Sequence, residues 1–264
     1  MRPSIEVLFQ GFPGKTDRGF LGWSSCVLLR GEHTGLFDTA GFAERQELVH
    51  RLKRRGLSPE HIDYVVLSHF HFDHAANVLL FSKATIYLHE LELQHVRESG
   101  RIDYAVPWEM FETVSRTGRL QTLKGASGTL PEGLAWMHTP GHTPGSITLV
   151  VDSPRGRFAL AADAIKNRDE ARTGNVWMSV DPAASRESIA RILDTADWVV
   201  PGHDGILRVN HVPNGREVHA TERTRGIIDL ILTEVDSQIH VTNSDGQQIK
   251  GMSPVYFEIK GDPS

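Results

Sequence analysis

Short apolar runs alternate with segments of helical periodicity along most of the chain. The runs at residues 64–67 and 158–162 are continuous and end in polar residues, which is typical of strands buried in a sheet. Residues 43–55 place Leu48 and Leu52 four apart, and residues 181–196 repeat this helical spacing. The mixture predicts a compact α/β chain.

Local signals set several boundaries. Residues 27–29 and 35–37 are expected to pair as strands through the turn at residues 31–33. Asp181 is expected to cap a helix, because Pro182 then takes the first helical position.

The length of the chain fits one domain with two additions. A sequence of 264 residues is long for one domain but within the range of sandwich folds. We expect residues 1–264 to form one domain, with an insertion near residues 100–118. An extension is expected near residues 206–264, as an added hairpin, a pocket wall or a contact between copies in a homo-oligomer.

Composition narrows the class of partner. A net charge of −5 gives no strong footprint for nucleic acid or an anionic membrane. The single cysteine, Cys26, lies in an apolar run and is expected in the core. The sequence shows neither a signal peptide nor an apolar run long enough to span a bilayer, so a cytoplasmic protein is expected.

The densest chemistry lies at residues 68–74, Ser-His-Phe-His-Phe-Asp-His. His69 and His71 are two apart, so in an extended segment their side chains leave the same side. Asp73 and His74 follow where the chain is expected to turn, and can point to a second position. Imidazole and carboxylate donors suit Zn²⁺, and also iron or manganese.

Three further candidates follow strand-like runs downstream. His142 stands in the loop Thr-Pro-Gly-His-Thr-Pro-Gly, Asp163 ends the run at residues 158–162, and His203 follows Trp-Val-Val-Pro-Gly. Each is held by Gly or Pro or by a strand end, which is how sheet scaffolds carry sites. A lone histidine is more often a solvated or core residue, but this combination makes chance clustering a poor explanation.

The order His-x-His-x-Asp-His, Gly-His, Asp, Gly-His resembles the metallo-β-lactamase superfamily over roughly residues 20–210. The resemblance implies a four-layer αββα sandwich with two metals at one edge. It also implies the role of each donor: His69, His71 and His142 for the first metal, Asp73, His74 and His203 for the second, and Asp163 as the bridge. Asp38 resembles the family's structural Asp beneath the site, with a turn or N-cap residue as the alternative.

The resemblance also directs attention to the substrate pocket. An early loop often covers the metal cleft in this superfamily, so Phe20 and Trp23 are candidates for substrate contact, with core anchoring as the alternative. Trp108 either borders the cleft or packs within an apolar flap. Lys166 and Trp177 lie close in sequence to the bridging Asp163.

The leading functional prediction is a dinuclear zinc hydrolase acting on a small ester, lactone or amide. A metal-bridging hydroxide is expected as the nucleophile, with Asp73 orienting it and passing a proton to the leaving group. The residues of the two histidine motifs look most similar to those of the lactonase-like branch of the superfamily. Acyl-homoserine lactonases, however, place Tyr three residues after the bridging Asp, where this chain has Lys166. That lysine either meets an anionic group or is an exposed loop residue.

Other functions remain open on the same scaffold, because a fold does not fix an activity. One is a persulfide dioxygenase with a single iron. Another is a nuclease, against which the negative charge argues. A binding protein with an inactive site is the fourth reading, but all seven expected ligands are present.

Overall fold

The computed structural model describes residues 4–12, 15–16, 19–20, 23–130, 133–213, 215–221, 229–232 and 239–242. The chain divides into two compact units. Unit 1 comprises Met1–Phe12 and Trp23–Arg223, and unit 2 comprises Pro13–Gly22 and Thr224–Ser264. The expectation of one domain over the whole chain stays a prediction.

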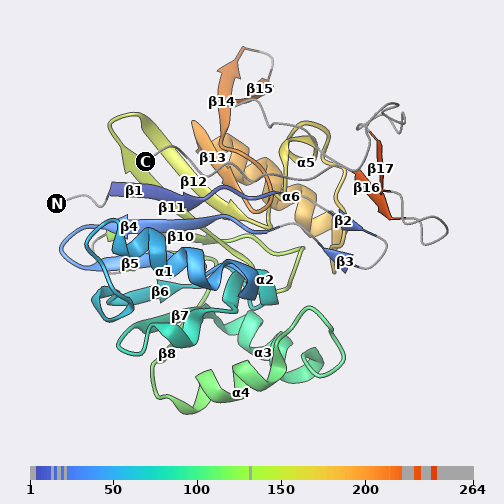
Figure 1. The fold of residues 1–264 in the computed structure, drawn as a ribbon. Helices are drawn as coiled ribbons and strands as arrows, with labels where there is room; N and C mark the ends of the chain where they lie inside the picture. Colours follow the sequence, from blue (N-terminus) through green and yellow to red (C-terminus); the bar gives the residue numbers. More distant parts are fainter. Residues whose placement is uncertain are drawn as a thin grey trace. The chain divides into compact units, whose positions relative to one another are not determined.

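The first sheet of unit 1 has six strands in the order β1-β4-β5-β6-β7-β8 (Figure 1). β1, β4 and β5 pair antiparallel, as expected for the strands around residues 31–33, and β5 to β8 pair parallel. The strands are β1 (Ser4–Phe9), β4 (Cys26–Arg30), β5 (Thr34–Phe37), β6 (Tyr64–Val66), β7 (Thr85–His89) and β8 (Leu120–Leu123).

The second sheet has seven strands in the order β15-β14-β13-β12-β11-β10-β9. All neighbours pair antiparallel except β12 and β13, which are parallel. The strands are β9 (Ser127–Thr129), β10 (Ala135–His138), β11 (Ile147–Ser153), β12 (Gly156–Ala162), β13 (Trp198–Pro201), β14 (Leu207–Val212) and β15 (Gly215–Ala220). The first part of the expected extension therefore continues this sheet.

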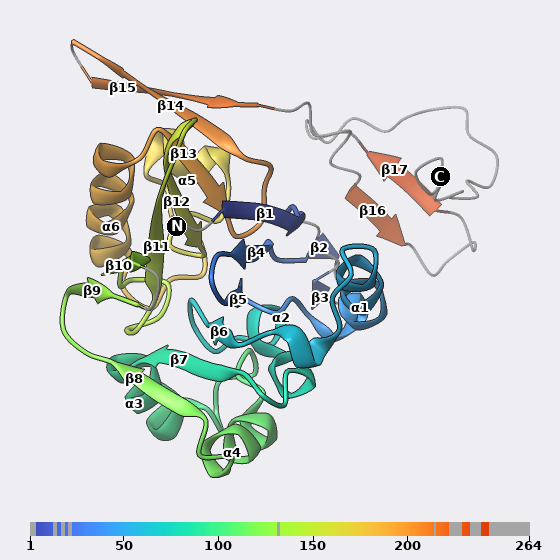
Figure 2. The ribbon, with the colours of Figure 1, turned by 90° about the vertical axis from the view of Figure 1, so that its left-hand side faces the viewer.

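Helices cover the outer faces of both sheets. Figure 2 shows α1 and α6 on opposite outer sides of the two sheets. The helices are α1 (Arg45–Lys53), α2 (Phe72–Ala75), α3 (Glu90–Ser99), α4 (Trp108–Arg116), α5 (Arg168–Thr173) and α6 (Pro182–Thr195), with short 3-10 turns at Phe42–Glu44, Pro59–His61 and Val78–Leu80. Of these, α4 lies within the expected insertion.

Side-chain alternation along the strands builds three separate apolar layers. Phe158 and Leu160 of β12 point between the sheets, whereas Ala159 and Ala161 face the helix layer beside Ile192 of α6. A third cluster joins the first sheet to α1, α3 and α4. Three buried interfaces separate four layers, so the predicted αββα sandwich is confirmed.

The cap of α6 was predicted correctly. Asp181 accepts hydrogen bonds from the amides of Ala183 and Ala184, both at 3.0 Å, and Pro182 takes the first helical position. None of the helices in the described residues combines the length and the apolar character that a membrane span requires.

Unit 2 contains two short antiparallel pairs among its described residues. β2 (Lys15–Thr16) pairs with β3 (Gly19–Phe20), and β16 (Asp229–Leu232) pairs with β17 (Ile239–Thr242).

Candidate metal centre

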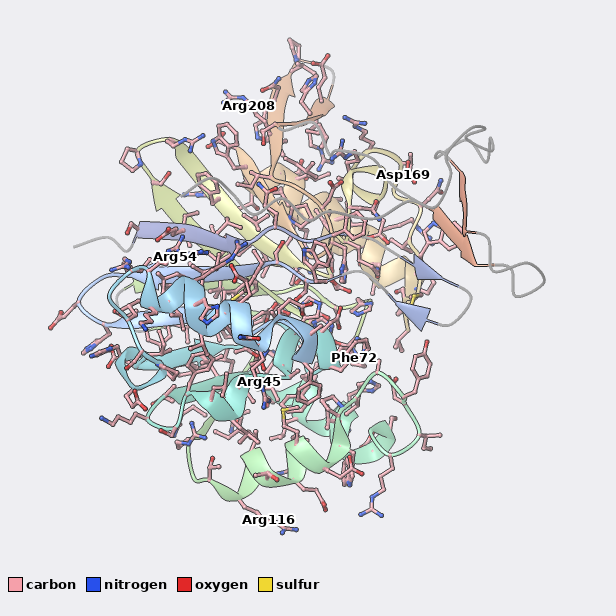
Figure 3. All side chains as sticks on the ribbon, in the orientation of Figure 1. Arg45, Arg54, Phe72, Arg116, Asp169 and Arg208 are labelled. Carbon is pink, nitrogen blue, oxygen red and sulfur yellow. The ribbon has the colours of Figure 1, made fainter. Side chains whose placement is uncertain are left out.

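Sheet topology brings the candidate ligands together. His69 and His71 follow β6, and His71 is the N-cap of the short helix α2, whose first residue, Phe72, is labelled in Figure 3. Asp163 and His203 follow β12 and β13, which are parallel neighbours with Ala162 paired to Pro201. Carboxyl ends of parallel strands meet at one edge of a sheet, so these two side chains become neighbours.

The first group of donors consists of His69, His71 and His142. One nitrogen from each ring lies within 4.8 Å of the others. The closest approach is between Nε2 of His142 and Nδ1 of His71, at 3.0 Å. The structure therefore places together the three residues that the sequence assigned to the first metal.

The second group consists of Asp73, His74 and His203, whose donor atoms also lie within 4.8 Å of one another. Oδ2 of Asp73 is 3.3 Å from Nε2 of His203 and 3.8 Å from Nε2 of His74. These are the residues that the sequence assigned to the second metal.

Asp163 lies between the two groups. Its Oδ2 is 3.3 Å from Nε2 of His142, while its Oδ1 is 3.2 Å from Nε2 of His74 and 3.3 Å from Nε2 of His203. One carboxylate oxygen thus faces each group, which is the arrangement required of a bridging ligand.

The unpartnered atoms of the centre show that these residues fit metal ions. Nε2 of His69, Nε2 of His74 and Oδ1 of Asp163 are buried and make no hydrogen bond with any residue that the structure describes. Buried polar atoms without a partner are rare and costly unless an ion or water completes them. Nitrogen and oxygen donors in this ratio suit zinc, iron or manganese.

Four of the five candidate ligand imidazoles also make a hydrogen bond at the nitrogen that faces away from the centre, and Nε2 of the fifth, His71, lies at ion-pair distance from Asp103. Such contacts fix the ring orientation and the tautomer of a metal-binding histidine. His71 presents Nδ1 to the centre and the other four histidines present Nε2. The partners behind the rings are Ser68 Oγ for His69 (2.9 Å), Asp103 Oδ2 for His71 (3.8 Å), Asp38 Oδ2 for His74 (2.8 Å), the Met178 carbonyl for His142 (2.8 Å) and the Trp23 carbonyl for His203 (3.1 Å).

Asp38 is fully buried and orders the metal-binding loop from below. It accepts hydrogen bonds from the amide and the hydroxyl of Ser68, at 2.7 and 2.8 Å, as well as from Nδ1 of His74. Its contacts are those of a structural residue beneath the site, and not those of an N-cap.

The electrostatics differ between the two groups. Burial lowers the pKa of His142 to about 3, so this imidazole is neutral, as a ligand must be. Burial opposes charge on His203 as well, but Asp163 and Asp73 outweigh it and raise the pKa of His203 to about 10. Likewise, His74 and His203 overcome burial and lower the pKa of Asp73 to about 2. The second group therefore favours positive charge between its carboxylates, which a metal cation supplies in place of protons.

A glycine makes room for the bridging carboxylate. A Cβ at Gly202 would lie 1.9 Å from Oδ1 of Asp163. The Gly202 amide donates to the carbonyl of Ala162 at 2.8 Å, which ties the two strand ends together. The Gly that precedes His203 is thus required by close approach of the chain to Asp163.

Lys166 is buried, so the alternative of an exposed loop lysine was wrong. Its Nζ lies 3.1 Å from Oε1 of Glu170, and its amide donates to Oε2 of the same carboxylate at 2.8 Å. The Lys166 carbonyl accepts the amide of His203 at 2.7 Å. Lys166 therefore also supports a ligand loop, and its substrate contact stays a prediction.

The other pocket candidates differ in their surroundings. Trp23 is 38% exposed and Trp177 is 72% exposed, so both offer apolar surface. Trp108 packs beside Phe111 and the apolar layer under α4, as the flap alternative expected. The side chain of Phe20 lies outside the described residues. Substrate contact by these four aromatic residues stays a prediction.

Three acidic residues near the ligands were missed. Asp103 lies behind His71, Glu170 pairs with Lys166, and Glu92 accepts three hydrogen bonds from the two ligand loops. None of the three belongs to a recognisable ligand or catalytic motif. The one local signal beside them is Asn167, which caps α5 and so places Glu170 in its first turn.

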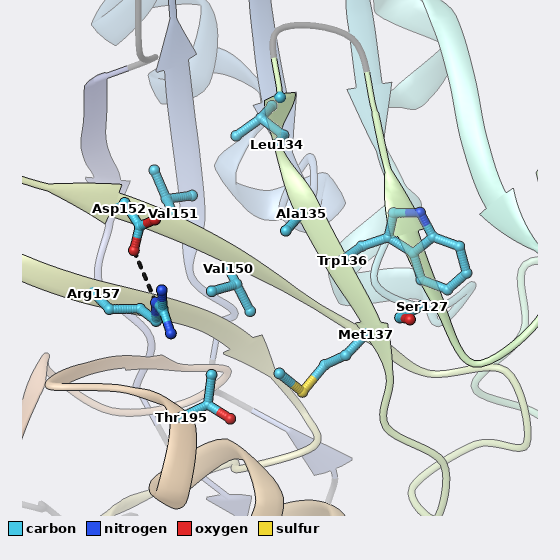
Figure 4. Close-up of a pocket in the computed structure, with 11 residues that line it drawn as sticks. Ser127, Leu134, Ala135, Trp136, Met137, Val150, Val151, Asp152, Arg157 and Thr195 are labelled. Carbon is cyan, nitrogen blue, oxygen red and sulfur yellow. Dashed lines mark hydrogen bonds and ion pairs between the residues drawn. The ribbon is translucent and has the colours of Figure 1, made fainter.

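A cavity of about 550 Å³ lies away from these residues, on the outer face of the second sheet (Figure 4). It is lined by Met137, Val150 and Thr195, and by the ion pair of Arg157 with Asp152 at 2.8 Å. None of the candidate ligands lines it, so it is separate from the metal centre.

Sequence comparisons relate the chain to known proteins. The family model described as the metallo-beta-lactamase superfamily matches residues 21–203. Metallo-beta-lactamase domain-containing protein 1 of Xenopus laevis is 32% identical over 212 residues, covering 78% of this chain and 82% of that protein. An N-acyl homoserine lactonase of a Bacillus species is 27% identical over 166 residues, covering 61% of this chain and 63% of the lactonase.

A solved structure adds support for the fold. A dizinc quorum-quenching lactonase in complex with a product superposes with a TM-score of 0.62 at 18% identity, covering 77% of this chain and 81% of the lactonase.

Proposed function

The chain belongs to the metallo-β-lactamase superfamily, and from this premise we propose that it is a dinuclear metal-dependent hydrolase of a small ester, lactone or amide. One observation carries the proposal: the Asp163 carboxylate lies between two complete donor groups, with one oxygen facing each. The similarity to lactonases supports hydrolysis of an acyl or lactone bond.

Zinc is the proposed metal. Five imidazoles and two carboxylates form the donor set, and imidazole-rich sites with carboxylate suit Zn²⁺. Iron and manganese accept the same donors, so metal identity is part of the test. When bound, a pair of such cations lowers the pKa of a shared water to about 7 and polarises a carbonyl oxygen.

The side chains of the protein have separate proposed roles in this reaction. Asp73 is the residue proposed to orient the nucleophile and to carry a proton to the leaving group. Its Oδ2 lies 3.3 Å from Nε2 of His203, so the carboxylate is already aimed at the centre. His69 and His142 are buried and neutral, which leaves their lone pairs available as ligands.

Exposed apolar side chains next to the ligands support a substrate with an apolar part. Trp23 and Met178 each accept a hydrogen bond from a ligand histidine through the main chain, and their side chains are 38% and 51% exposed. Trp177, 72% exposed, precedes Met178. We propose that this apolar surface contacts a small-molecule substrate rather than nucleic acid.

Metal analysis combined with a substrate panel tests the proposal. The protein is purified without added metal, its ions are counted, and lactones, esters, thioesters and activated aryl ethers are assayed with and without a chelator. We expect two ions per chain and turnover that the chelator abolishes and zinc restores. No metal-dependent turnover across the panel would contradict the proposal, and one iron per chain with oxygen uptake would favour the dioxygenase.

A further inference from the structure

Glu92 of α3 is a fully buried carboxylate whose hydrogen-bond donors are all neutral. Its Oε1 accepts the amide of Phe70 at 2.9 Å, and its Oε2 accepts the hydroxyl of Thr143 at 2.6 Å and the amide of Gly145 at 3.2 Å. Burying a carboxylate is costly, so its presence here points to a specific task.

The donors to Glu92 flank the ligands of the first group. Phe70 stands between His69 and His71, and Thr143 directly follows His142. One carboxylate thus joins the two chain segments that carry all three histidines of this group. Within the described part of the chain, the hydrogen bonds of Glu92 go to Phe70, Thr143 and Gly145, and none goes to a residue of the second group.

The segment that carries His142 and Gly145 packs closely against α3. A Cβ at Gly145 would lie 2.0 Å from the amide nitrogen of Glu92. The loop of His142 therefore rests directly on the backbone of α3, and the Glu92 side chain bonds it from the same helix. Because the packing is this close, a shift of the Glu92 side chain displaces the loop that carries His142.

We propose that Glu92 is a positioning residue that sets the spacing between the His69–His71 segment and His142, and so the affinity of the first metal group. The inference rests on the proposed dinuclear centre. Each oxygen of Glu92 accepts a hydrogen bond from a backbone amide. A glutamine side chain has one oxygen and one NH₂ group, so in either orientation its NH₂ group would face one of these backbone donors and the hydrogen bond there would be lost. Glu92→Gln therefore disturbs one of the two segments while keeping the side-chain shape.

Metal titration of the metal-free proteins tests the proposal. Contacts behind metal ligands are worth about 10- to 100-fold in affinity, so Glu92→Gln is expected to weaken one of two ions by that factor. Glu90→Gln is the matched control on the same helix, because Glu90 is partly exposed and, among the described residues, accepts a hydrogen bond only from the amide of Gly125, at 3.1 Å. It is expected to bind both ions as the wild type does.

Two ligand variants identify which ion responds. In a His203→Ala background the tighter remaining ion belongs to the first group, and Glu92→Gln is expected to weaken it 10- to 100-fold. In a His71→Ala background the remaining ion belongs to the second group and is expected to keep its affinity. Equal losses in the two backgrounds, or no loss in either, would show that Glu92 serves only the general fold.

Thermal unfolding of the metal-free proteins shows whether the Glu92→Gln variant is folded. If Glu92→Gln does not fold, Thr143→Val removes one hydrogen-bond donor to Glu92 at nearly constant side-chain volume. It is expected to weaken the ion of the first group by a smaller factor and to leave the affinity of the second group unchanged. A wild-type protein that binds no metal would overturn the proposed function together with this inference. A wild-type protein with two ions and an unchanged Glu92→Gln variant would overturn the inference alone.

Discussion

The ammonium group of Lys166 lies 3.1 Å from the carboxylate of Glu170 in an almost fully buried pair, and its charge is close enough to His142 to contribute to the lowered pKa of that imidazole. Lys166 occupies the position, three residues after Asp163, where the resemblance to acyl-homoserine lactonases implies a Tyr. The positive charge near His142 is therefore already matched by a carboxylate. A substrate group that approaches Lys166 meets a positioned donor, and not an unpaired cation.

Lys166→Ala is expected to lower turnover about 10²-fold while both ions stay bound, because a positioned donor near the reacting carbonyl is lost. It is also expected to destabilise the fold, since breaking a buried ion pair typically costs about 3–5 kcal/mol. Steady-state kinetics, metal analysis and urea unfolding measure the three effects. Lys124→Ala, at an exposed position, is the control. A turnover and KM within about twofold of wild type would exclude a role in substrate contact.

His69→Ala and His142→Ala are each expected to lose the first ion and to abolish turnover. Each variant removes one of three donors from that group, and neither side chain builds the apolar core. Metal counting and circular dichroism check the two statements together. His50→Ala changes an exposed histidine on α1 and is expected to behave as wild type. Full activity with two ions in either ligand variant would refute the assignment.

Asp163→Asn keeps the shape of the bridge but removes its charge. The second group, whose histidines lie 3.2 and 3.3 Å from Oδ1, is expected to lose its ion first, because the pKa shifts there show the greater demand for negative charge. Metal titration followed by assay gives the order of loss. Two ions of unchanged affinity together with unchanged turnover would contradict bridging by this residue.

Gly202→Ala is expected to empty the centre without altering any ligand. The added methyl group would lie 1.9 Å from Oδ1 of Asp163, so the carboxylate must move away from His74 and His203. Gly205→Ala is the matched control, since its methyl group meets only Gln10, at 3.8 Å. Metal content of the two purified variants measures the difference. Equal metal content would show that the Asp163 site tolerates the displacement.

The sequence by itself identified the seven candidate ligands of this protein, because they follow local rules. His69 to His74 lie within one strand end and one helical turn, and short buried runs identify the strands that deliver Asp163 and His203. Continuous apolar runs and helical spacing likewise indicated a mixed α/β chain, and the resemblance carried by the ligand motifs implied its αββα layers. Even the cap at Asp181 followed from neighbouring residues alone.

Only the tertiary structure decided which other residues serve the centre. Glu92 and Lys166 belong to no motif, and both contact residues far away in sequence: Thr143 donates to the Glu92 side chain, and the amide of His203 donates to the Lys166 carbonyl. The helix α5 lacked an apolar period because it buries little besides Ala171 and the side chain of Glu170. The role of a charged residue depends on its surroundings in the fold, because long-range contacts set both the free-energy cost of burying it and the hydrogen bonds that it makes.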